Sequence, residues 1–276
     1  MTHKFVYFGT PTVASDTLAT LIEHGFIPSL VVTSPDAPKG RGLVLTPSPT
    51  KTLALANSIP VFTPEKLDAE SIATIHAITS DYALVVAYGK IFPEELIAAF
   101  PLGVLNVHYS LLPKYRGATP LETALLMGET ETGVTIQKMV KALDAGDIIV
   151  QESISITPHE TARELRPRLI ELGARLLVDT LPAFERGEMV STPQDDSLAT
   201  RARKITKEDG LLDLNASAIE NWNKYRAYAD SIGTYFFEDG KRMKITNAEF
   251  TKGEFCVLRV IPEGKKETIY RSATSA

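Results

Sequence analysis

Short apolar runs alternate with helical stretches along the first 110 residues, and this alternation limits the possible folds more than any other feature. Phe5–Phe8, Leu30–Val32 and Ala83–Ala87 are predicted strands, and the last is apolar throughout, as in a central strand buried on both faces. Helices are predicted between them, at Val13–Glu23 and Leu67–Ile78. Strands that alternate with helices favour a parallel sheet covered on both faces. The sequence therefore predicts an α/β fold with a doubly wound, mostly parallel, Rossmann-like sheet.

The second half of the chain changes character twice. A long helix is predicted at Thr161–Phe184, and from Met189 to about Thr200 the periodicity fails while Ser, Thr, Pro and Asp dominate, as in a linker. Short strands joined by turns such as Asp239-Gly240 then follow. We therefore expect an α/β domain at residues 1–188, a linker at 189–205 and a small β domain at 206–276.

Composition excludes several classes of protein. The chain is 44% hydrophobic and 23% charged, which is ordinary for a soluble globular protein. No apolar run approaches the roughly 20 residues that span a bilayer, and the N-terminus enters a strand without a signal peptide. We expect a cytoplasmic protein that does not bind membranes. The single cysteine, Cys256, excludes an intramolecular disulfide and a cysteine-built metal site.

The charge is unevenly distributed along the chain. The net charge of −5 argues against a protein that binds nucleic acid over its whole surface. From residue 201 onward, however, 14 Lys and Arg stand against 11 Asp and Glu, a balance of +3. Such a portion can steer a polyanion to one side of the protein, although a difference of this size also arises by chance.

A polar pair ends the predicted strand Gly103–His108. Alternation along the strand places Asn106 and His108 on the same face. The amide can donate a hydrogen bond to an oxygen that becomes negative, and the imidazole can donate a bond or transfer a proton. An acid such as Asp144 can orient the ring and keep it charged. These three residues are the candidate catalytic group.

Other common sites are not indicated. Phe8-Gly9-Thr10-Pro11 follows the first strand, where a dinucleotide fingerprint would stand, but G-x-G-x-x-G is absent. The chain has neither a P-loop nor H-E-x-x-H. The remaining histidines, His3, His24, His76 and His159, lack ligand spacing, and we expect no metal.

Two longer strings surround the candidate catalytic group. Residues 106–117 read Asn-Val-His-Tyr-Ser-Leu-Leu-Pro-Lys-Tyr-Arg-Gly, and residues 143–147 read Leu-Asp-Ala-Gly-Asp. Together they resemble the signature of the 10-formyltetrahydrofolate-dependent formyltransferases. Phe8–Pro11, Ser34–Gly42 and Pro47–Lys51 resemble those members of the family that formylate the amino group of initiator methionyl-tRNA. The resemblance covers nearly the whole chain and is weaker after about residue 230.

The resemblance implies a site and a donor. It implies that 10-formyltetrahydrofolate is the formyl donor, that Asn106 and His108 stabilise the oxyanion, and that Asp144 keeps His108 charged and relays protons. It also implies a folate pocket made largely of backbone groups. The pocket is expected around residues 86–93, residues 140–144 and the loop after the catalytic strand. Its residues are Val86, Ala87, Tyr88, Gly89, Ile91, Phe92, Ser110, Leu111, Leu112, Pro113 and Val140.

The resemblance also implies contacts with tRNA. The segment Thr33–Pro49 is long for a connection inside a compact domain, and such loops are usually functional. In the family this segment enters the acceptor arm of the tRNA, and Lys39 and Arg41 are its expected contacts. Lys51 and Arg116, outside the segment, are also expected to bind tRNA. The family's basic residues after Gly-Arg-Gly are replaced by Leu43-Val44-Leu45. The alternative is that Arg41 pairs with an acid and braces the loop.

The C-terminal part departs further from the family. The resemblance implies an OB-like β-barrel that grips tRNA, but Lys241–Ile261 is shorter than the corresponding stretch. The family's Pro-Trp-Pro turn is missing after Arg226. We expect a shortened OB-like domain on a formyltransferase catalytic domain, acting as a monomer. A sugar-amine N-formyltransferase with the same donor, and a non-catalytic relative that binds RNA or folate, remain alternatives.

Overall fold

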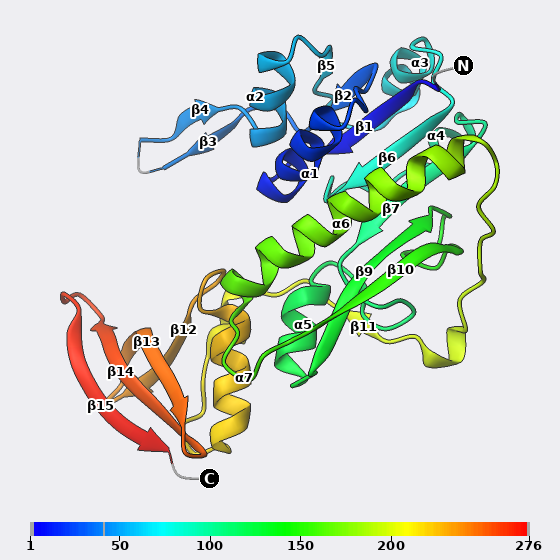
Figure 1. Ribbon diagram of the computed structural model, residues 1–276. Helices are drawn as coiled ribbons and strands as arrows, with labels where there is room; N and C mark the ends of the chain where they lie inside the picture. Colours follow the sequence, from blue (N-terminus) through cyan, green and yellow to red (C-terminus); the bar gives the residue numbers. More distant parts are fainter. Residues whose placement is uncertain (1–2, 41, 275–276) are drawn as a thin grey trace. The chain divides into compact units, whose positions relative to one another are not determined.

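The computed structural model describes residues 3–40 and 42–274 of the chain (Figure 1). By spatial contact the chain forms two compact units. Unit 1 comprises residues 1–114, 133–152 and 169–199, and unit 2 comprises residues 115–132, 153–168 and 200–276. The chain thus passes between the units several times, and each unit is described by itself.

Unit 1 is built on a seven-stranded sheet with the order β10-β9-β7-β6-β1-β2-β5. The pairs β1/β2, β1/β6, β2/β5 and β6/β7 are parallel, and β7/β9 is antiparallel. The sheet is therefore mostly parallel, as the sequence predicts. Its strands are β1 (Phe5–Gly9), β2 (Leu30–Val32), β5 (Val61–Phe62), β6 (Tyr82–Val86), β7 (Gly103–His108), β9 (Glu131–Lys138) and β10 (Ile148–Ser155). The first two residues of β9 and the last three of β10 are counted with unit 2.

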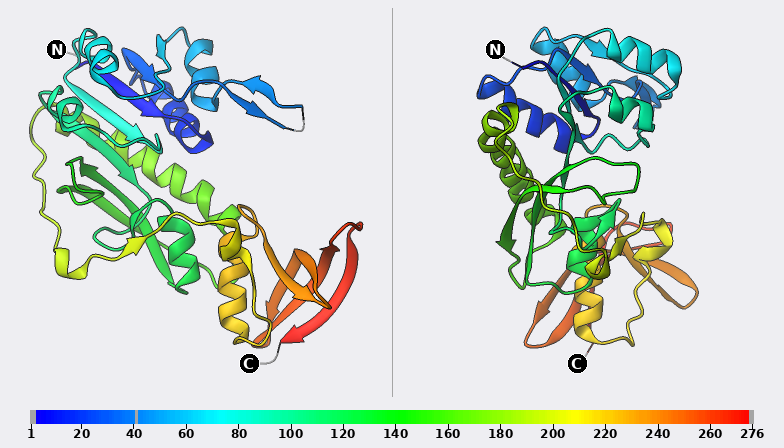
Figure 2. Two further views of the ribbon diagram at one scale, coloured as in Figure 1. Left: turned by 180° about the vertical axis from the view of Figure 1, so that it is seen from behind. Right: turned by 90° about the vertical axis from the view of Figure 1, so that its right-hand side faces the viewer.

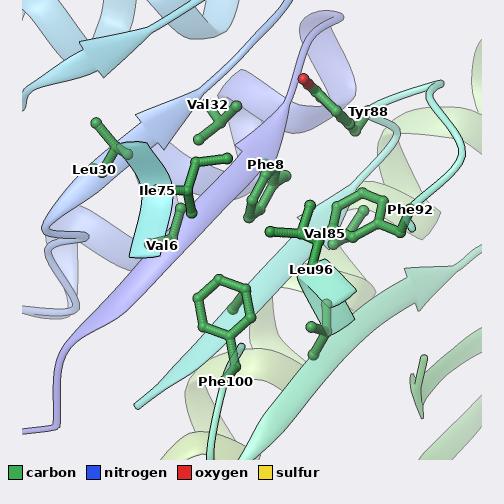
Figure 3. Close-up of a cluster of buried hydrophobic side chains, with 12 residues drawn as sticks. Val6, Phe8, Leu30, Val32, Ile75, Val85, Tyr88, Phe92, Leu96 and Phe100 are labelled. Carbon is green, nitrogen blue, oxygen red and sulfur yellow. The ribbon is translucent and has the colours of Figure 1, made fainter. Parts of the chain in front are cut away.

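Helices cover both faces of this sheet. They are α1 (Thr12–Glu23), α2 (Pro49–Ala56), α3 (Ala69–His76), α4 (Glu94–Ala98) and α6 (Ala162–Glu185), of which residues 162–168 belong to unit 2. Figure 3 shows side chains from α3 and α4 packed against β1, β2 and β6, with Phe8 at the centre of the cluster. On the other face, the Tyr7 hydroxyl donates to the Ala14 carbonyl of α1 at 2.7 Å, and Tyr82 packs edge-on against Phe184 of α6. This is the doubly wound arrangement.

Local sequence signals explain where these elements begin. Ser48 accepts a hydrogen bond from the backbone N–H of Lys51, and Asp68 accepts one from Ser71, so α2 and α3 both start at an N-cap. Gly9 ends β1, where an added Cβ would lie 2.5 Å from the Ala14 side chain. A glycine there lets α1 approach the strand closely. This packing explains the glycine after Phe8 without any need for a dinucleotide-binding site.

The segment that follows β2 contains a hairpin, where the sequence suggests only a loop. β3 (Ala37–Lys39) and β4 (Val44–Thr46) pair antiparallel and extend away from the sheet (Figures 1 and 2). Val44 and Leu45 are both about two-thirds exposed, at 66% and 69%. Because neither face of this hairpin is buried, the sequence carries no apolar–polar alternation from which to predict it.

Unit 2 contains a small antiparallel sheet and two longer helices. The sheet has the order β12-β13-β14-β15, with every neighbouring pair antiparallel. These strands are Thr234–Glu238, Lys241–Thr251, Glu254–Pro262 and Thr268–Thr274. The remaining elements are β8 (Arg116–Gly117), α5 (Pro120–Leu126), β11 (Arg201–Ala202), α7 (Ala218–Tyr228) and the short 3-10 helices Asp196–Leu198 and Lys207–Gly210, of which the first lies in unit 1.

The core of unit 2 is aromatic. Trp222 of α7 stacks on Tyr225 and on Phe250 of β13, with ring centroids 5.7 and 6.1 Å apart. The start of α7 is set by a capping box between Ser217 and Glu220. The expected small β domain is thus confirmed, as a four-stranded sheet covered by α7. Within the described part of the chain, no helix is both long and apolar enough to cross a membrane.

Candidate active site

The candidate catalytic residues come together at the end of β7. Asn106 and His108 lie on this strand, which borders the parallel part of the sheet and pairs with β9 on its other side. The Asn106 amide nitrogen donates to Asp144 Oδ1 at 3.5 Å. His108 Nδ1 lies 3.6 Å from Asp144 Oδ2. The three side chains of the candidate catalytic group thus lie together at the end of β7.

The site is well shielded from solvent. The side chains of His108 and Asp144 are 6% and 12% exposed. Electrostatic attraction is stronger in such an environment than in water, so the imidazole and the carboxylate interact more strongly here than an exposed pair would. The arrangement can hold a positive charge on the ring beside an amide donor.

The turn that carries Asp144 has an unusual backbone. Asp144 adopts a φ of +50°, in the left-handed region, which costs a non-glycine residue about 1 kcal/mol or more. Two residues later, a Cβ on Gly146 would lie 1.7 Å from the Lys138 carbonyl oxygen. Only glycine allows the turn to pack so closely on the end of β9. The sequence Leu-Asp-Ala-Gly-Asp thus has a backbone requirement as well as a chemical one.

Two glutamines contact this turn and are missed by the sequence analysis. Gln137 lies opposite Asn106 in the β7/β9 register, and its Nε2 donates to Asp144 Oδ1 at 3.0 Å. Gln194 Nε2 donates to the carbonyl oxygens of Asp144 and Gly146 at 2.9 and 2.7 Å. The alternation of the polar residues Thr135 and Gln137 along β9 could have indicated that Gln137 faces the site. No local pattern identifies the second, because it lies in the predicted linker.

The loop after β7 is held by a buried threonine. Thr135, paired with His108 in the register, donates from Oγ1 to the Ser110 carbonyl at 2.7 Å and accepts from the backbone N–H of Leu112 at 3.2 Å. Ser110 is fully buried, and its hydroxyl donates to the Lys114 carbonyl at 2.7 Å. Ser110 therefore has a structural role within the loop. Leu112 is buried, whereas Leu111 and Pro113 are half-buried.

The other predicted folate contacts fall on two neighbouring loops. Lys141 Nζ lies 3.1 Å from Glu94 Oε2 at the start of α4, and Met139 packs on the core cluster that contains Tyr88 and Phe92, so residues 139–141 lie close to the end of the first loop. The exposed members of this set are Ala87, Gly89, Ile91 and Val140, and the buried members are Val86, Tyr88 and Phe92. Ile91 is 92% exposed and Val140 45%.

One polar atom of this region stands out. The Tyr88 hydroxyl is buried, and among the described residues no hydrogen-bond partner is found for it. Burial raises the pKa of this phenol to about 12. Such a hydroxyl is available to form a hydrogen bond with a water molecule or a ligand.

The described residues that are predicted to contact tRNA lie in different elements of the fold. Lys39 is exposed on β3, and Arg41 lies outside the described residues. Lys51 forms an ion pair with Asp36 at 2.8 Å, near the base of the hairpin. Arg116 lies in β8 of unit 2, which pairs in parallel with β11. In the described part of the chain, no group of three His, Cys, Asp or Glu side chains is placed to hold a metal ion.

Two family models match the chain. The model described as formyl transferase matches residues 3–181. The model described as formyl transferase, C-terminal domain, matches residues 204–267. Together these matches include most of both compact units.

Curated relatives match nearly the whole chain. A methionyl-tRNA formyltransferase from Acidobacterium capsulatum is 43% identical over 244 residues, which is 88% of this chain and 78% of the relative. The enzyme of the same name from a Sulfurihydrogenibium species is 40% identical over 261 residues, covering 94% of this chain and 83% of the relative.

Solved structures show the same fold at low identity. The N-formyltransferase of Helicobacter canadensis, crystallised with folinic acid and dTDP-3-aminofucose, covers 98% of this chain and 100% of its own, with a TM-score of 0.69 at 20% identity. Glycinamide ribonucleotide transformylase 1 from Symbiobacterium toebii covers 70% and 94%, with a TM-score of 0.58 at 18% identity. From the family model and the curated relatives, the chain belongs to the formyl transferase family.

Proposed function

We propose that this chain transfers a formyl group from 10-formyltetrahydrofolate to the α-amino group of initiator methionyl-tRNA, in translation initiation. The observation that carries the proposal is the convergence of Asn106, His108 and Asp144 at the end of β7. It occurs in a chain that is 43% identical to methionyl-tRNA formyltransferases over most of its length. The similarity to sugar N-formyltransferases, at about half that identity, supports the fold alone.

The proposed chemistry needs donors aimed at one oxygen. When bound, the folate supplies the formyl carbon that the amine attacks. The Asn106 amide and protonated His108 would donate hydrogen bonds to the oxygen on which negative charge develops. In comparable sites, a preorganised donor of this kind lowers the activation free energy by about 3–4 kcal/mol. Holding both substrates in position adds a further contribution.

Asp144 would serve His108 and the proton transfer. Its Oδ2 faces the imidazole at 3.6 Å, and its Oδ1 accepts bonds from Asn106 and Gln137. With one oxygen held by amides and the other facing the ring, the carboxylate would keep His108 charged. Together with a water, it would also accept the proton that the attacking amine loses and pass it to N10 of the folate, as the bond between N10 and the formyl carbon breaks.

The loops beside this site fit a folate ring. Exposed Ile91 and Val140 offer apolar surface, exposed Ala87 and Gly89 offer backbone groups, and the Tyr88 hydroxyl lacks a partner among the described residues. This combination of apolar surface with a few polar groups is typical of a site for an aromatic ligand. We propose that these residues, with Val86, Phe92, Leu111, Leu112 and Pro113, hold the donor, while Ser110 shapes the loop.

The acceptor would be bound by the hairpin and the C-terminal part. We propose that Lys39, Arg41, Lys51 and Arg116 contact phosphates or bases of the acceptor stem. The exposed position of Lys39 on β3 supports this role, whereas the ion pair of Lys51 with Asp36 has first to open or turn outward. In this proposal residues 1–188 form the catalytic domain, 189–205 a linker and 206–276 the tRNA-binding domain of a cytoplasmic monomer.

An assay with purified protein tests the proposal. The protein is supplied with 10-formyltetrahydrofolate and either methionyl-tRNA or amino-sugar nucleotides, and formylated product is measured. Formylation of methionyl-tRNA alone is expected. Formylation of an amino sugar and not of methionyl-tRNA would replace the proposed acceptor, and no formylation with either would contradict the enzymatic role.

A further inference from the structure

A short segment after α6 runs directly beside the turn that carries Asp144. We call residues 191–194 the strap. Thr192 and Ile148 exchange two backbone hydrogen bonds, each 2.8 Å long. The Ser191 hydroxyl donates to Asp147 Oδ2 at 3.0 Å. All of these residues belong to unit 1. The strap is thus fastened to the start of β10, just past the candidate catalytic turn.

The strap ends in a side chain that fastens the turn itself. Both short hydrogen bonds of the Gln194 amide go to backbone carbonyls of the turn, those of Asp144 and Gly146. The same nitrogen lies 3.4 Å from Gln137 Oε1. Because Asp144 is held in the left-handed region, its backbone conformation depends on such contacts. Gln194 supplies two of them from a residue that is 50 positions away in the chain.

A second glutamine fastens the carboxylate. Gln137 is 1% exposed, and its amide nitrogen donates to Asp144 Oδ1 at 3.0 Å, a shorter contact than the one from Asn106. Occupation of Oδ1 by two amides leaves Oδ2 directed at His108. The backbone and the side chain of Asp144 are therefore held by different glutamines, which also approach each other.

We propose that Gln194 and Gln137 are positioning residues for formyl transfer. Gln194, on the strap, sets the backbone of the turn, and Gln137 sets the rotation of the carboxylate, so that Oδ2 of Asp144 faces the imidazole of His108. The proposal rests on the proposed function, because it requires Asp144 to take part in the reaction. It assigns a catalytic consequence to a segment that otherwise resembles a linker.

The test separates positioning from general stability. Gln194→Ala and Gln194→Glu both remove the amide donor, and the second keeps the size of the side chain. Each is expected to lower kcat about tenfold, because small displacements of a catalytic group have effects of this size. The KM values for methionyl-tRNA and for 10-formyltetrahydrofolate are expected to stay within about twofold. Val190→Ala, at an exposed residue just before the strap, is the matched control and should behave as wild type.

A double-mutant cycle makes the test specific. Because Gln194 acts through Asp144, adding Gln194→Ala to Asp144→Ala should leave kcat at the value of the single Asp144→Ala variant. Unchanged kcat in both Gln194 variants, or an equal further loss in the Asp144→Ala background, would overturn the positioning role. If Asp144→Ala alone kept wild-type kcat, the proposed function of Asp144 would fail instead, which distinguishes the two.

Gln137 is tested in the same way. Gln137→Leu removes the donor at nearly constant volume, so that a loss of packing does not explain its effect. It is expected to lower kcat with little change in either KM and to add nothing to Asp144→Ala. A thermal midpoint close to that of wild type would show that the loss of kcat does not come from unfolding. Wild-type kcat for Gln137→Leu would remove this residue from the proposal.

Discussion

Nδ1 of His108 lies 3.6 Å from Oδ2 of Asp144, and both side chains are nearly buried. The two residues are 36 positions apart in the chain and come from different parts of the fold. The imidazole comes from the end of a strand, and the carboxylate comes from a turn with a left-handed backbone. In this shielded site, the carboxylate attracts a charged ring more strongly than it would in water. The proposed reaction requires that charge.

Removal of either partner should lower turnover strongly. His108→Ala and Asp144→Ala are each expected to reduce kcat for formyl transfer about 10²-fold or more, as is usual for acid–base groups. Folate affinity, measured by fluorescence or calorimetry, should change little. His76→Ala, at an exposed histidine at the end of α3, is the control. Turnover near wild type for either variant would remove that residue from the chemistry.

Loss of the amide beside the ring should have a comparable effect for a different reason. Asn106→Ala removes a hydrogen-bond donor for the developing negative charge, and single donors of this kind contribute about 10²–10³-fold to kcat. The KM for methionyl-tRNA should be nearly unchanged, because the interaction forms mainly in the transition state. An increase in KM with constant kcat would instead assign Asn106 to substrate binding.

The hairpin should act on the tRNA alone. Lys39→Ala and Arg41→Ala are expected to raise the KM for methionyl-tRNA and to weaken the salt dependence of its binding, since each removes a phosphate contact. Folate affinity should stay the same. Lys66→Ala, at an exposed lysine outside the hairpin, serves as the control. An equal KM for methionyl-tRNA in wild type and Arg41→Ala, at matched ionic strength, would contradict the tRNA role of the hairpin.

The catalytic turn should not accept a side chain at Gly146. Gly146→Ala places a Cβ 1.7 Å from the Lys138 carbonyl oxygen, so the backbone has to move. We expect a loss of about 1–3 kcal/mol in the free energy of unfolding, as for other overpacked sites. We also expect kcat to fall, because the same movement displaces Asp144. Urea denaturation and the formyl-transfer assay measure the two effects, and wild-type values in both would show that the turn is more adaptable than its geometry indicates.

Acid should weaken one local structure of unit 2. Hydrogen bonds from the Arg203 guanidinium, followed by those from the Thr206 backbone, hold the pKa of Asp209 well below its usual range. A lowered pKa in the folded state means that this carboxylate contributes stability above the ordinary carboxyl pKa of about 4. That contribution is lost as the pH falls from there towards the lowered value.

The variant Asp209→Asn tests this. It should be less stable than wild type at pH 7, and the difference should have narrowed by about half or more near pH 2. Asp239→Asn, in the exposed turn between β12 and β13, should show no such pattern. A difference between wild type and Asp209→Asn that stays constant from pH 7 to pH 2 would contradict the assignment.

Features with a local cause could be predicted from the sequence. The predicted strand Ala83–Ala87 corresponds to the buried central strand β6 (Tyr82–Val86), which begins and ends one residue earlier, and the predicted helix Val13–Glu23 corresponds to α1 (Thr12–Glu23). Asn106 and His108 fall on one face of β7 because strand side chains alternate. The family resemblance, which includes Leu143-Asp144, distinguishes Asp144 from the other acids that could orient the ring, because motif matching does not depend on the distance between residues in the fold.

Other features depend on contacts between distant parts of the chain. The hairpin β3–β4 has no buried face, so no periodicity announces it. Gln194 stands in a polar stretch that resembles any linker, and only its place against the turn distinguishes it. Residue types and spacing thus determined the order of the elements and the candidate chemistry. The tertiary structure decided which side chains hold Asp144 in place, because an amide becomes a positioning group only where its hydrogen-bond partners lie.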